Sequence, residues 1–96
     1  MTRKITKKSM YVGMLVVTTD WLGAQVYTIA HIFKNSNMVE LQHKEGERQC
    51  SQVTDYSLLM NPTIKQIEHS INDNGPLVGV NDLFINNYIE SPLGGL

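Results

Sequence analysis

Three histidines and a single cysteine are the side chains of this 96-residue chain best suited to metal binding or nucleophilic catalysis. His31, His43 and His69 are widely separated, and the chain contains neither an HExxH motif nor a CxxC pair. A nucleophilic pair of Cys50 and His43 would need both side chains on one face, with a third group to orient the base. The glycines form no phosphate-binding loop. The sequence therefore predicts no metal site, no cofactor, no catalytic residue and no enzymatic activity.

Aromatic side chains are better candidates for a binding surface. Trp21 is the only tryptophan and lies in a predicted turn, where its ring could anchor a protein interface or stack on a base. The same ring could instead fold back over the end of the sheet as part of the core. Three further aromatic residues could join it at the rim of a small barrel. The predicted binding residues, for protein or nucleic acid, are Trp21, Tyr27, Phe33 and Tyr56.

Basic residues are concentrated at the N-terminus. Residues 1–8 carry four basic and no acidic side chains, whereas the chain after Lys65 has acidic residues but no lysine or arginine. A basic arm attracts phosphate groups and could contact nucleic acid, although it could equally serve solubility alone. A nucleic-acid interface would use Arg3, Lys4, Lys7, Lys8, Lys34, Lys44 and Arg48.

The composition is that of one small globular domain. With 42% hydrophobic residues, 18% charged residues and a net charge of −1, the chain is neither disordered nor strongly basic. Its longest apolar run, residues 14–17, is far shorter than the roughly 20 residues that cross a bilayer. No apolar signal segment follows the basic N-terminus, and one cysteine fits a reducing compartment. We expect a cytoplasmic protein without membrane contact.

The first half of the chain has the pattern of β-strands. Residues 11–18, 24–33 and 38–43 are rich in β-branched and aromatic residues and lack a helical period. Turn-forming residues separate these runs at 20–23 and 35–37. The second run is apolar on both faces, which predicts a central strand covered on both sides.

A third turn, at Glu45-Gly46, predicts a β-hairpin. If these two residues form the loop, Lys44 lies opposite Glu47 and Leu41 lies opposite Cys50. In this register the thiol of Cys50 faces the core. The register therefore predicts a small buried hydrophobic residue rather than a nucleophile.

Beyond residue 60 the pattern becomes helical. Asn61-Pro62-Thr63 predicts an N-cap followed by proline at the first helical position. Ile64, Ile67 and Ile71 then form an apolar stripe that is predicted to face the core. Turn formers at residues 72–76 end this helix.

Residues 11–60 carry a recognisable pattern of glycines and strands. The strand Val12-Gly13-Met14-Leu15-Val16 leads to Gly23, and then to the strands Val26-Tyr27-Thr28-Ile29 and Met38-Val39-Glu40-Leu41. This pattern resembles the SH3-like small barrels of the KOW and Tudor kind. Residues 52–59 are similar to the end of such domains, where a helical turn precedes the last strand. The resemblance implies an SH3-like barrel, a fold that serves many unrelated functions.

One enzyme family with a similar barrel is also relevant. Val53-Thr54-Asp55-Tyr56 is similar to a Val-Gln-Ile-Tyr run that type II dihydrofolate reductases, which are tetramers, use in a central pore. Only Val53 and Tyr56 match, and Asp55 places a carboxylate where that family has isoleucine. A small oligomeric enzyme with a site at a subunit interface is therefore the third-ranked hypothesis.

These patterns predict a mainly β fold with an α addition: an SH3-like small β-barrel followed by one or two short C-terminal helices, the second from residue 81 or 82 to 90. The predicted parts of this single domain are a basic flexible arm (1–10), the barrel (11–60), a helical extension packed on it (61–90) and a flexible tail (91–96). The leading hypothesis is a non-catalytic module that binds another protein or self-associates through the barrel rim and the C-terminal helices. The alternative is a nucleic-acid-binding accessory protein that uses the basic arm and the barrel loops.

Overall fold

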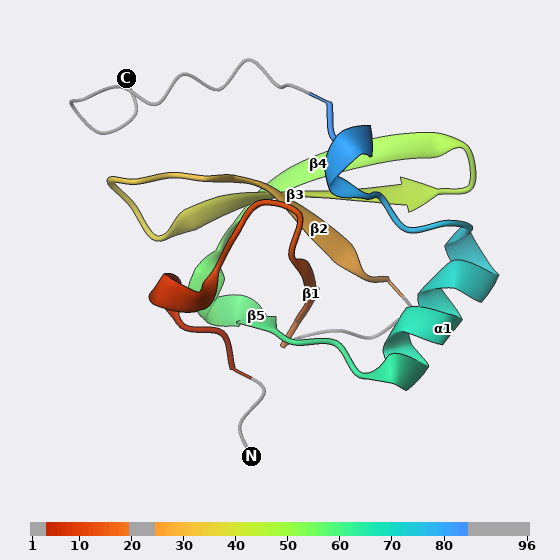
Figure 1. The fold of residues 1–96 in the computed structure, drawn as a ribbon, viewed down its shortest axis with the longest axis horizontal. Helices are drawn as coiled ribbons and strands as arrows, with labels where there is room; N and C mark the ends of the chain where they lie inside the picture. The colour runs from red at the N-terminus through yellow and green to blue at the C-terminus, as the bar shows by residue number, and fades with distance from the viewer. Residues whose placement is uncertain (1–3, 20–24, 85–96) are drawn as a thin grey trace.

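The computed structural model describes residues 4–19 and 25–84, which form a five-stranded antiparallel sheet, one α-helix and three short 3-10 turns (Figure 1). The predicted turn at residues 20–23 and the predicted tail at 91–96 lie outside the described residues. In chain order the elements are η1 (Lys7–Ser9), β1 (Leu15–Thr18), β2 (Tyr27–Ile32), β3 (Met38–Glu45), β4 (Arg48–Asp55), η2 (Tyr56–Leu58), β5 (Leu59–Met60), α1 (Ile64–Asn74) and η3 (Val80–Asp82).

The strands are ordered β4-β3-β2-β1-β5, and each neighbouring pair is antiparallel. The sheet curls into a half-barrel, which is consistent with a small barrel (Figure 1). β2 is the central strand of the sheet. Its consecutive residues Thr28 and Ile29 are buried on opposite faces, as the apolar pattern predicts. η2 directly precedes the last strand, which confirms the prediction for residues 52–59. The mainly β fold with an added helix is thus confirmed.

One face of the curled sheet carries the apolar core. Val16 on β1, Ile29 on β2 and Leu41 on β3 are fully buried, and Ile29 and Leu41 are direct cross-strand neighbours. Alternating side chains produce this face because successive residues of a strand point to opposite sides. The buried cluster consists of Ile5, Met14, Val16, Ile29, Val39, Leu41 and Leu59.

The N-terminal segment differs from the predicted flexible arm. Lys4 forms an antiparallel bridge with Met60, and Ile5 beside it is only 4% exposed within the core. Burial of one isoleucine side chain stabilises a fold by roughly 1.5–3 kcal/mol, which offsets the entropy lost when a short segment is ordered. The following strand is also shorter than predicted, since Gly13 takes a φ of +96° in a turn and β1 begins only at Leu15.

Helix α1 begins two residues later than predicted. Its N-cap is Thr63, whose hydroxyl accepts from the backbone N–H of Gln66 at 3.1 Å, while the Gln66 side chain accepts from the N–H of Thr63 at 2.9 Å. This reciprocal capping box fixes the start and leaves Pro62 before the cap rather than inside the helix. The helix ends within the predicted turn formers, at Gly75 with a φ of +89°. No helix in residues 4–19 and 25–84 is both long enough and apolar enough to span a bilayer.

The chain after α1 folds back over the second face of the sheet (Figure 1). Where the second helix was predicted to begin, the chain forms only the single 3-10 turn η3 and is extended again at Leu83. The physical reason is that the carbonyl of Phe84 accepts from the side-chain amide of Gln42, so it is not available for the hydrogen bond that a helix would need from it. Residues 85–90 of the predicted second helix lie outside the described residues.

The β3–β4 hairpin has a different register from the one predicted. Its loop is Gly46-Glu47, so that Glu45 pairs with Arg48 and His43 pairs with Cys50. Gly46 takes a φ of +68°, as the first loop residue of a type II′ hairpin turn does. The predicted register requires a positive φ at Glu45. This conformation is unfavourable for a residue with a Cβ atom but not for glycine. The shift of two residues keeps Cys50 on the same face but places it opposite His43, half-buried rather than buried.

The packing of Ile5 yields a stability prediction. Ile5→Ala should lower the free energy of unfolding by about 2–4 kcal/mol, because it leaves a cavity in the core. Urea denaturation measures the change, with the exposed Lys8→Ala as the control, which should stay within about 0.5 kcal/mol of the unmodified protein. Equal stability of the two variants would mean that residues 4–10 do not pack on the sheet in solution.

Candidate functional site

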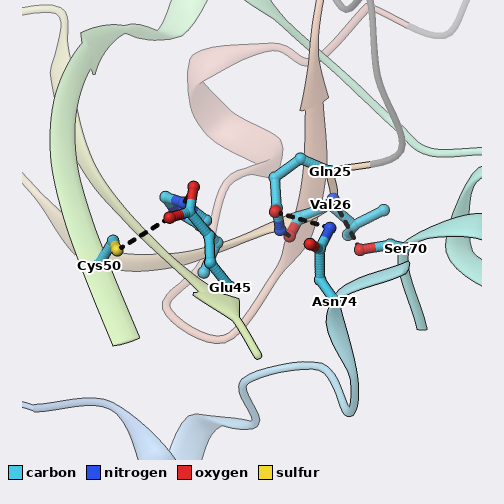
Figure 2. A network of polar contacts seen from close by, with 7 residues as sticks. Gln25, Val26, Glu45, Cys50, Ser70 and Asn74 are labelled. Atoms are coloured by element: carbon cyan, nitrogen blue, oxygen red, sulfur yellow. Dashed lines mark hydrogen bonds and ion pairs between the residues drawn. The ribbon is translucent and has the colours of Figure 1, made fainter. Parts of the chain in front are cut away.

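Helix α1 turns its isoleucine stripe only partly toward the sheet. Ser70 is the buried residue of the helix, and its hydroxyl accepts from the backbone N–H of Val26 at 3.1 Å (Figure 2). By contrast, Ile64 is 77% exposed and Ile71 is 43% exposed. The prediction that the isoleucines at 64, 67 and 71 face the core is therefore wrong for the first and last, and Ile67 is half-buried.

Polar contacts fix this rotation of the helix. Besides the bond from Val26 to Ser70, the side-chain amide of Asn74 donates to Gln25 at 3.1 Å (Figure 2). Ser70 and Asn74 are four residues apart and lie on one face of the helix, so both bonds hold the same face against the two residues that directly precede β2. That face lies beside the isoleucine stripe rather than on it.

The exposed flank of α1 is apolar with an acidic centre. Ile64 and Ile71 are separated by seven residues, or two helical turns, and therefore project from the same side about 10 Å apart along the axis. Glu68 follows Ile64 by four residues and precedes Ile71 by three, so it lies on the same side of the helix. Its side chain is exposed. This set, Ile64, Glu68 and Ile71, is called the α1 flank below.

The second face of the sheet buries Val17 and Val26, carries polar side chains on β3 and β4, and is covered by the backbone of residues 78–84. Gln42, which is fully buried, donates to the carbonyl of Phe84 at 2.8 Å and accepts from its N–H at 3.1 Å. Gln49 donates to the carbonyl of Asp82 at 3.0 Å and to the side chain of Gln42 at 2.9 Å. Side-chain amides therefore hold this segment by its main chain, in the manner of a bound peptide.

The same face holds a buried carboxylate. Glu40 is 3% exposed and accepts from the hydroxyl of Ser51 at 2.9 Å and from the amide of Gln42 at 3.4 Å. His31 is its cross-strand neighbour. Both bonds reach the same carboxylate oxygen, Oε2, and with 3% exposure the carboxylate belongs to the internal structure of the sheet rather than to an open site.

A second group of reactive side chains lies at the end of the β3–β4 hairpin. The Nε2 atom of His43 is 3.5 Å from one carboxylate oxygen of Glu45. The thiol of Cys50 is 3.9 Å from the other oxygen, and Figure 2 shows this contact between Cys50 and Glu45. The three potential ligand atoms lie within 4.8 Å of one another. His43 is inward, with an 11% exposed side chain, whereas the side chain of Glu45 is 57% exposed. This set, His43, Glu45 and Cys50, is called the hairpin cluster.

The predicted aromatic binding residues do not form one rim in the described part of the chain. Tyr27 begins β2 and packs edge-on against His43 with ring centroids 5.0 Å apart, whereas Phe33 directly follows the other end of β2. Tyr56 lies near Phe33, since its N–H bonds to Asn37 in the β2–β3 turn. All three rings are half-buried. Trp21 lies outside the described residues.

The predicted basic residues are divided between two ends of the hairpin. Lys7 donates to the side chain of Asn37 at 3.3 Å, which places η1 beside the β2–β3 turn that contains Lys34. Lys44 and Arg48 lie at the opposite end, next to the β3–β4 loop. The exposed residues of the first group are Lys4, Lys7, Lys8 and Lys34; Arg3 lies outside the described residues.

Asp55 has a structural role. It is the N-cap of η2, where its carboxylate accepts from the N–H of Ser57 at 2.9 Å. This hydrogen bond stabilises the charged form and lowers the pKa of Asp55 below its ordinary value of 3.8. The charged cap therefore stabilises η2 fully at pH values above the ordinary pKa of 3.8. This stabilisation is lost as the pH falls through the lowered pKa of Asp55.

Sequence reasoning missed the hairpin cluster and the α1 flank for different reasons. The cluster was hidden by the choice of hairpin loop, because the register decides which residue lies opposite Cys50. Requiring Gly46 rather than Glu45 at the first loop position would have placed Cys50 opposite His43. The α1 flank had no comparable signal, since the rotation of α1 depends on bonds to residues 25 and 26.

The buried amide of Gln42 leads to a second prediction. Gln42→Leu should lower the free energy of unfolding by about 2–4 kcal/mol, since the polar groups of Phe84 and Gln49 lose their partner. The matched control is Gln52→Leu, the same change at an exposed position of β4, which should stay within about 0.5 kcal/mol. Hydrogen exchange at the Phe84 amide should accelerate only in the first variant. Unchanged exchange in Gln42→Leu would contradict the hydrogen bond from the Phe84 amide to Gln42.

Comparisons with known proteins identify no family for this chain. No protein-family model matches this chain, and neither does any curated protein sequence or any solved structure. The function must therefore be inferred from the geometry of the described residues, above all from the α1 flank and the hairpin cluster.

Proposed function

We propose that this protein is a non-catalytic interaction module whose helix α1 docks into an apolar groove of another protein. The observation that carries the proposal is the exposure of Ile64 and Ile71 on one side of a rigidly held helix. Amphipathic helices bind grooves through apolar anchors at such spacings. Large apolar side chains at 77% and 43% exposure gain free energy when a partner removes them from water.

The shape of the α1 flank favours a groove over a second copy of the chain. A stable interface between two proteins buries about 800 Å² on each partner, far more than two isoleucine side chains offer on a flat contact. An 11-residue helix, about 16 Å long, reaches such an area only when a concave surface encloses it. Glu68, between the two anchors, would suit a groove with a lysine or arginine at its rim.

The sheet would serve as the scaffold for this helix. We infer an SH3-like barrel from the meander order of the strands and from the 3-10 turn before β5. The polar bonds from Ser70 and Asn74 to the start of β2 hold α1 on that scaffold, so the helix is presented ready-formed and loses little entropy on binding. A cytoplasmic location remains a prediction from the single cysteine.

Site-specific photo-crosslinking tests the proposal. A photoreactive phenylalanine analogue at position 64 or at position 71 should crosslink to one and the same protein in an extract of the source cells. The analogue at position 69, where His69 is exposed on another side of α1, is the matched control and should not. Excess unlabelled protein should compete the crosslink, and the Ile64→Lys/Ile71→Lys variant should fail to compete.

Two results would contradict this interaction. The first is crosslinking of equal strength from position 69. The second is a concentration-dependent dimer in sedimentation that Ile71→Lys abolishes, because that would assign the α1 flank to a second copy of the chain. Both lysine substitutions should leave the free energy of unfolding within about 0.5 kcal/mol, since the replaced side chains are exposed.

Nucleic-acid binding is the second candidate, and one observation favours it. The bond from Lys7 to Asn37 brings the lysines of η1 beside the turn that contains Lys34 and follows Phe33. A group of cations near an aromatic ring suits single-stranded nucleic acid. The residues at the other end of the hairpin would take no part in this surface.

Fluorescence anisotropy with labelled single-stranded DNA and RNA tests this candidate. Binding should weaken at least tenfold between about 50 and 200 mM salt, because phosphate contacts release counterions. Lys7→Glu/Lys8→Glu should abolish it, whereas Lys44→Glu/Arg48→Glu, at the opposite end, should not. Equal loss in both variants, or no binding at the lower salt concentration, would remove the candidate.

A further inference from the structure

We propose that the hairpin cluster binds one Zn²⁺ ion, with Nε2 of His43, a carboxylate oxygen of Glu45 and the thiolate of Cys50 as ligands. The fourth position of the tetrahedron remains open to water or to a donor from another molecule. This site is separate from the α1 flank and does not depend on the proposed function.

The distances within the cluster fit a zinc ion. In a tetrahedral site with Zn–N and Zn–O bonds near 2.0 Å and a Zn–S bond near 2.3 Å, neighbouring ligand atoms lie about 3.3–3.6 Å apart. The structure has 3.5 Å between Nε2 of His43 and one carboxylate oxygen of Glu45, and 3.9 Å between the thiol of Cys50 and the other oxygen, so the carboxylate must rotate to offer one oxygen to the ion. The three ligand atoms lie within 4.8 Å of one another, so side-chain rotations that shorten the longest separation by roughly 1.3 Å would complete the geometry.

The backbone determines which residues meet. His43 and Cys50 are directly opposite each other on β3 and β4, and Glu45 follows two residues later on the same face of β3. The two strands are joined by a two-residue loop, so the ligands are held by regular hairpin backbone rather than by a long loop. The loop is itself attached, since the N–H of Gly46 donates to the carbonyl of Asn74 at the end of α1.

The donor set favours zinc over harder cations. A thiolate and an imidazole select Zn²⁺ and similar borderline-soft ions, whereas Mg²⁺ and Ca²⁺ need oxygen ligands. On binding, the Cys50 thiol releases its proton to the solvent, and the charges of thiolate and carboxylate together balance that of the ion. The partly exposed side chains of Glu45 and Cys50 leave a path for the ion to enter.

The arrangement does not fit a cysteine nucleophile with a histidine base. Such a site needs the thiol on one imidazole nitrogen and the orienting carboxylate on the other. Here Glu45 lies on Nε2, and its second oxygen contacts the thiol. The Nδ1 atom of His43 is buried without a hydrogen-bond partner among the described residues, so the orienting carboxylate of a catalytic triad has no counterpart there. Three side chains that converge on one point are what a metal ion requires.

The ring of His43 is held in place for this role. Its side chain is only 11% exposed, and the ring packs edge-on against Tyr27 with centroids 5.0 Å apart. This packing limits the rotation of the imidazole and points Nε2 toward Glu45. A ligand that is fixed before binding loses less conformational entropy when the ion arrives.

Cobalt substitution and zinc competition test the site. The full-length reduced protein should bind one equivalent of Co²⁺ with a thiolate-to-cobalt charge-transfer band and the intense visible bands of tetrahedral coordination. Zn²⁺ should displace the cobalt, and competition against a chromophoric chelator gives its affinity. Zinc should also raise the Tm in proportion to the logarithm of its concentration.

Variants distinguish a built site from adventitious binding. Cys50→Ser should remove the charge-transfer band, and His43→Gln, Glu45→Gln and Cys50→Ser should each weaken zinc binding more than about 100-fold, beyond the loss expected from a residue that only orients a ligand. The matched controls are His69→Gln and Glu68→Gln, exposed residues of the same types on α1, which should bind as the unmodified protein does. Circular dichroism of each apo variant checks that the fold is kept.

Three outcomes would overturn the proposal. They are the absence of a charge-transfer band in the unmodified protein, equal zinc affinity in Cys50→Ser, and equal loss in the control variants. None of them would affect the crosslinking result at the α1 flank, because the substituted ligands lie on the β3–β4 hairpin.

Discussion

Gly46 occupies the first position of the β3–β4 loop with a φ of +68°, and this single backbone requirement determines which residues of the two longest strands face each other. With the loop at Gly46-Glu47, Cys50 meets His43, and Glu45 lies beside both. The same glycine donates its N–H to Asn74, so the loop that sets the register also supports the end of α1. The geometry of the hairpin cluster and the attachment of the C-terminal end of α1 therefore depend on the same turn.

The two faces of the sheet are stabilised by different physics. The first face buries aliphatic side chains such as Ile29 and Leu41, and its free energy comes from the removal of apolar surface from water. The second face also buries valines, but hydrogen bonds hold the segments beside it: Gln42 and Gln49 bind the backbone of residues 82–84, and the hydroxyl of Ser70 accepts from the N–H of Val26. Such bonds are directional, so they fix the rotation of α1 even though its isoleucines remain outside.

Much of the fold could be predicted from the sequence, because it rests on local patterns. The strands at β2 and β3, the helical turn before β5 and the helix after residue 60 each follow from alternation, turn formers or capping residues. The predictions from the sequence are wrong where long-range contacts determine the position of a segment. The sequence predicts a flexible arm at Ile5, because the burial of this residue depends on the pairing of Lys4 with Met60. The orientation of α1 depends on side chains at 25 and 26, which no helical period can show.

The pairing of β1 with β5 has a consequence for how the chain folds. Val17 lies beside Met60, and Thr18 beside Leu59, so the curled sheet closes through partners more than forty residues apart. Hairpins such as β3–β4 need only local contacts and form early, whereas this closure must first overcome the entropy of a long loop. During synthesis, Ile5 and Val16 must wait for residues 59 and 60 to leave the ribosome before their part of the core is complete. The last-made strand therefore controls when the first-made residues become protected from water and from proteases.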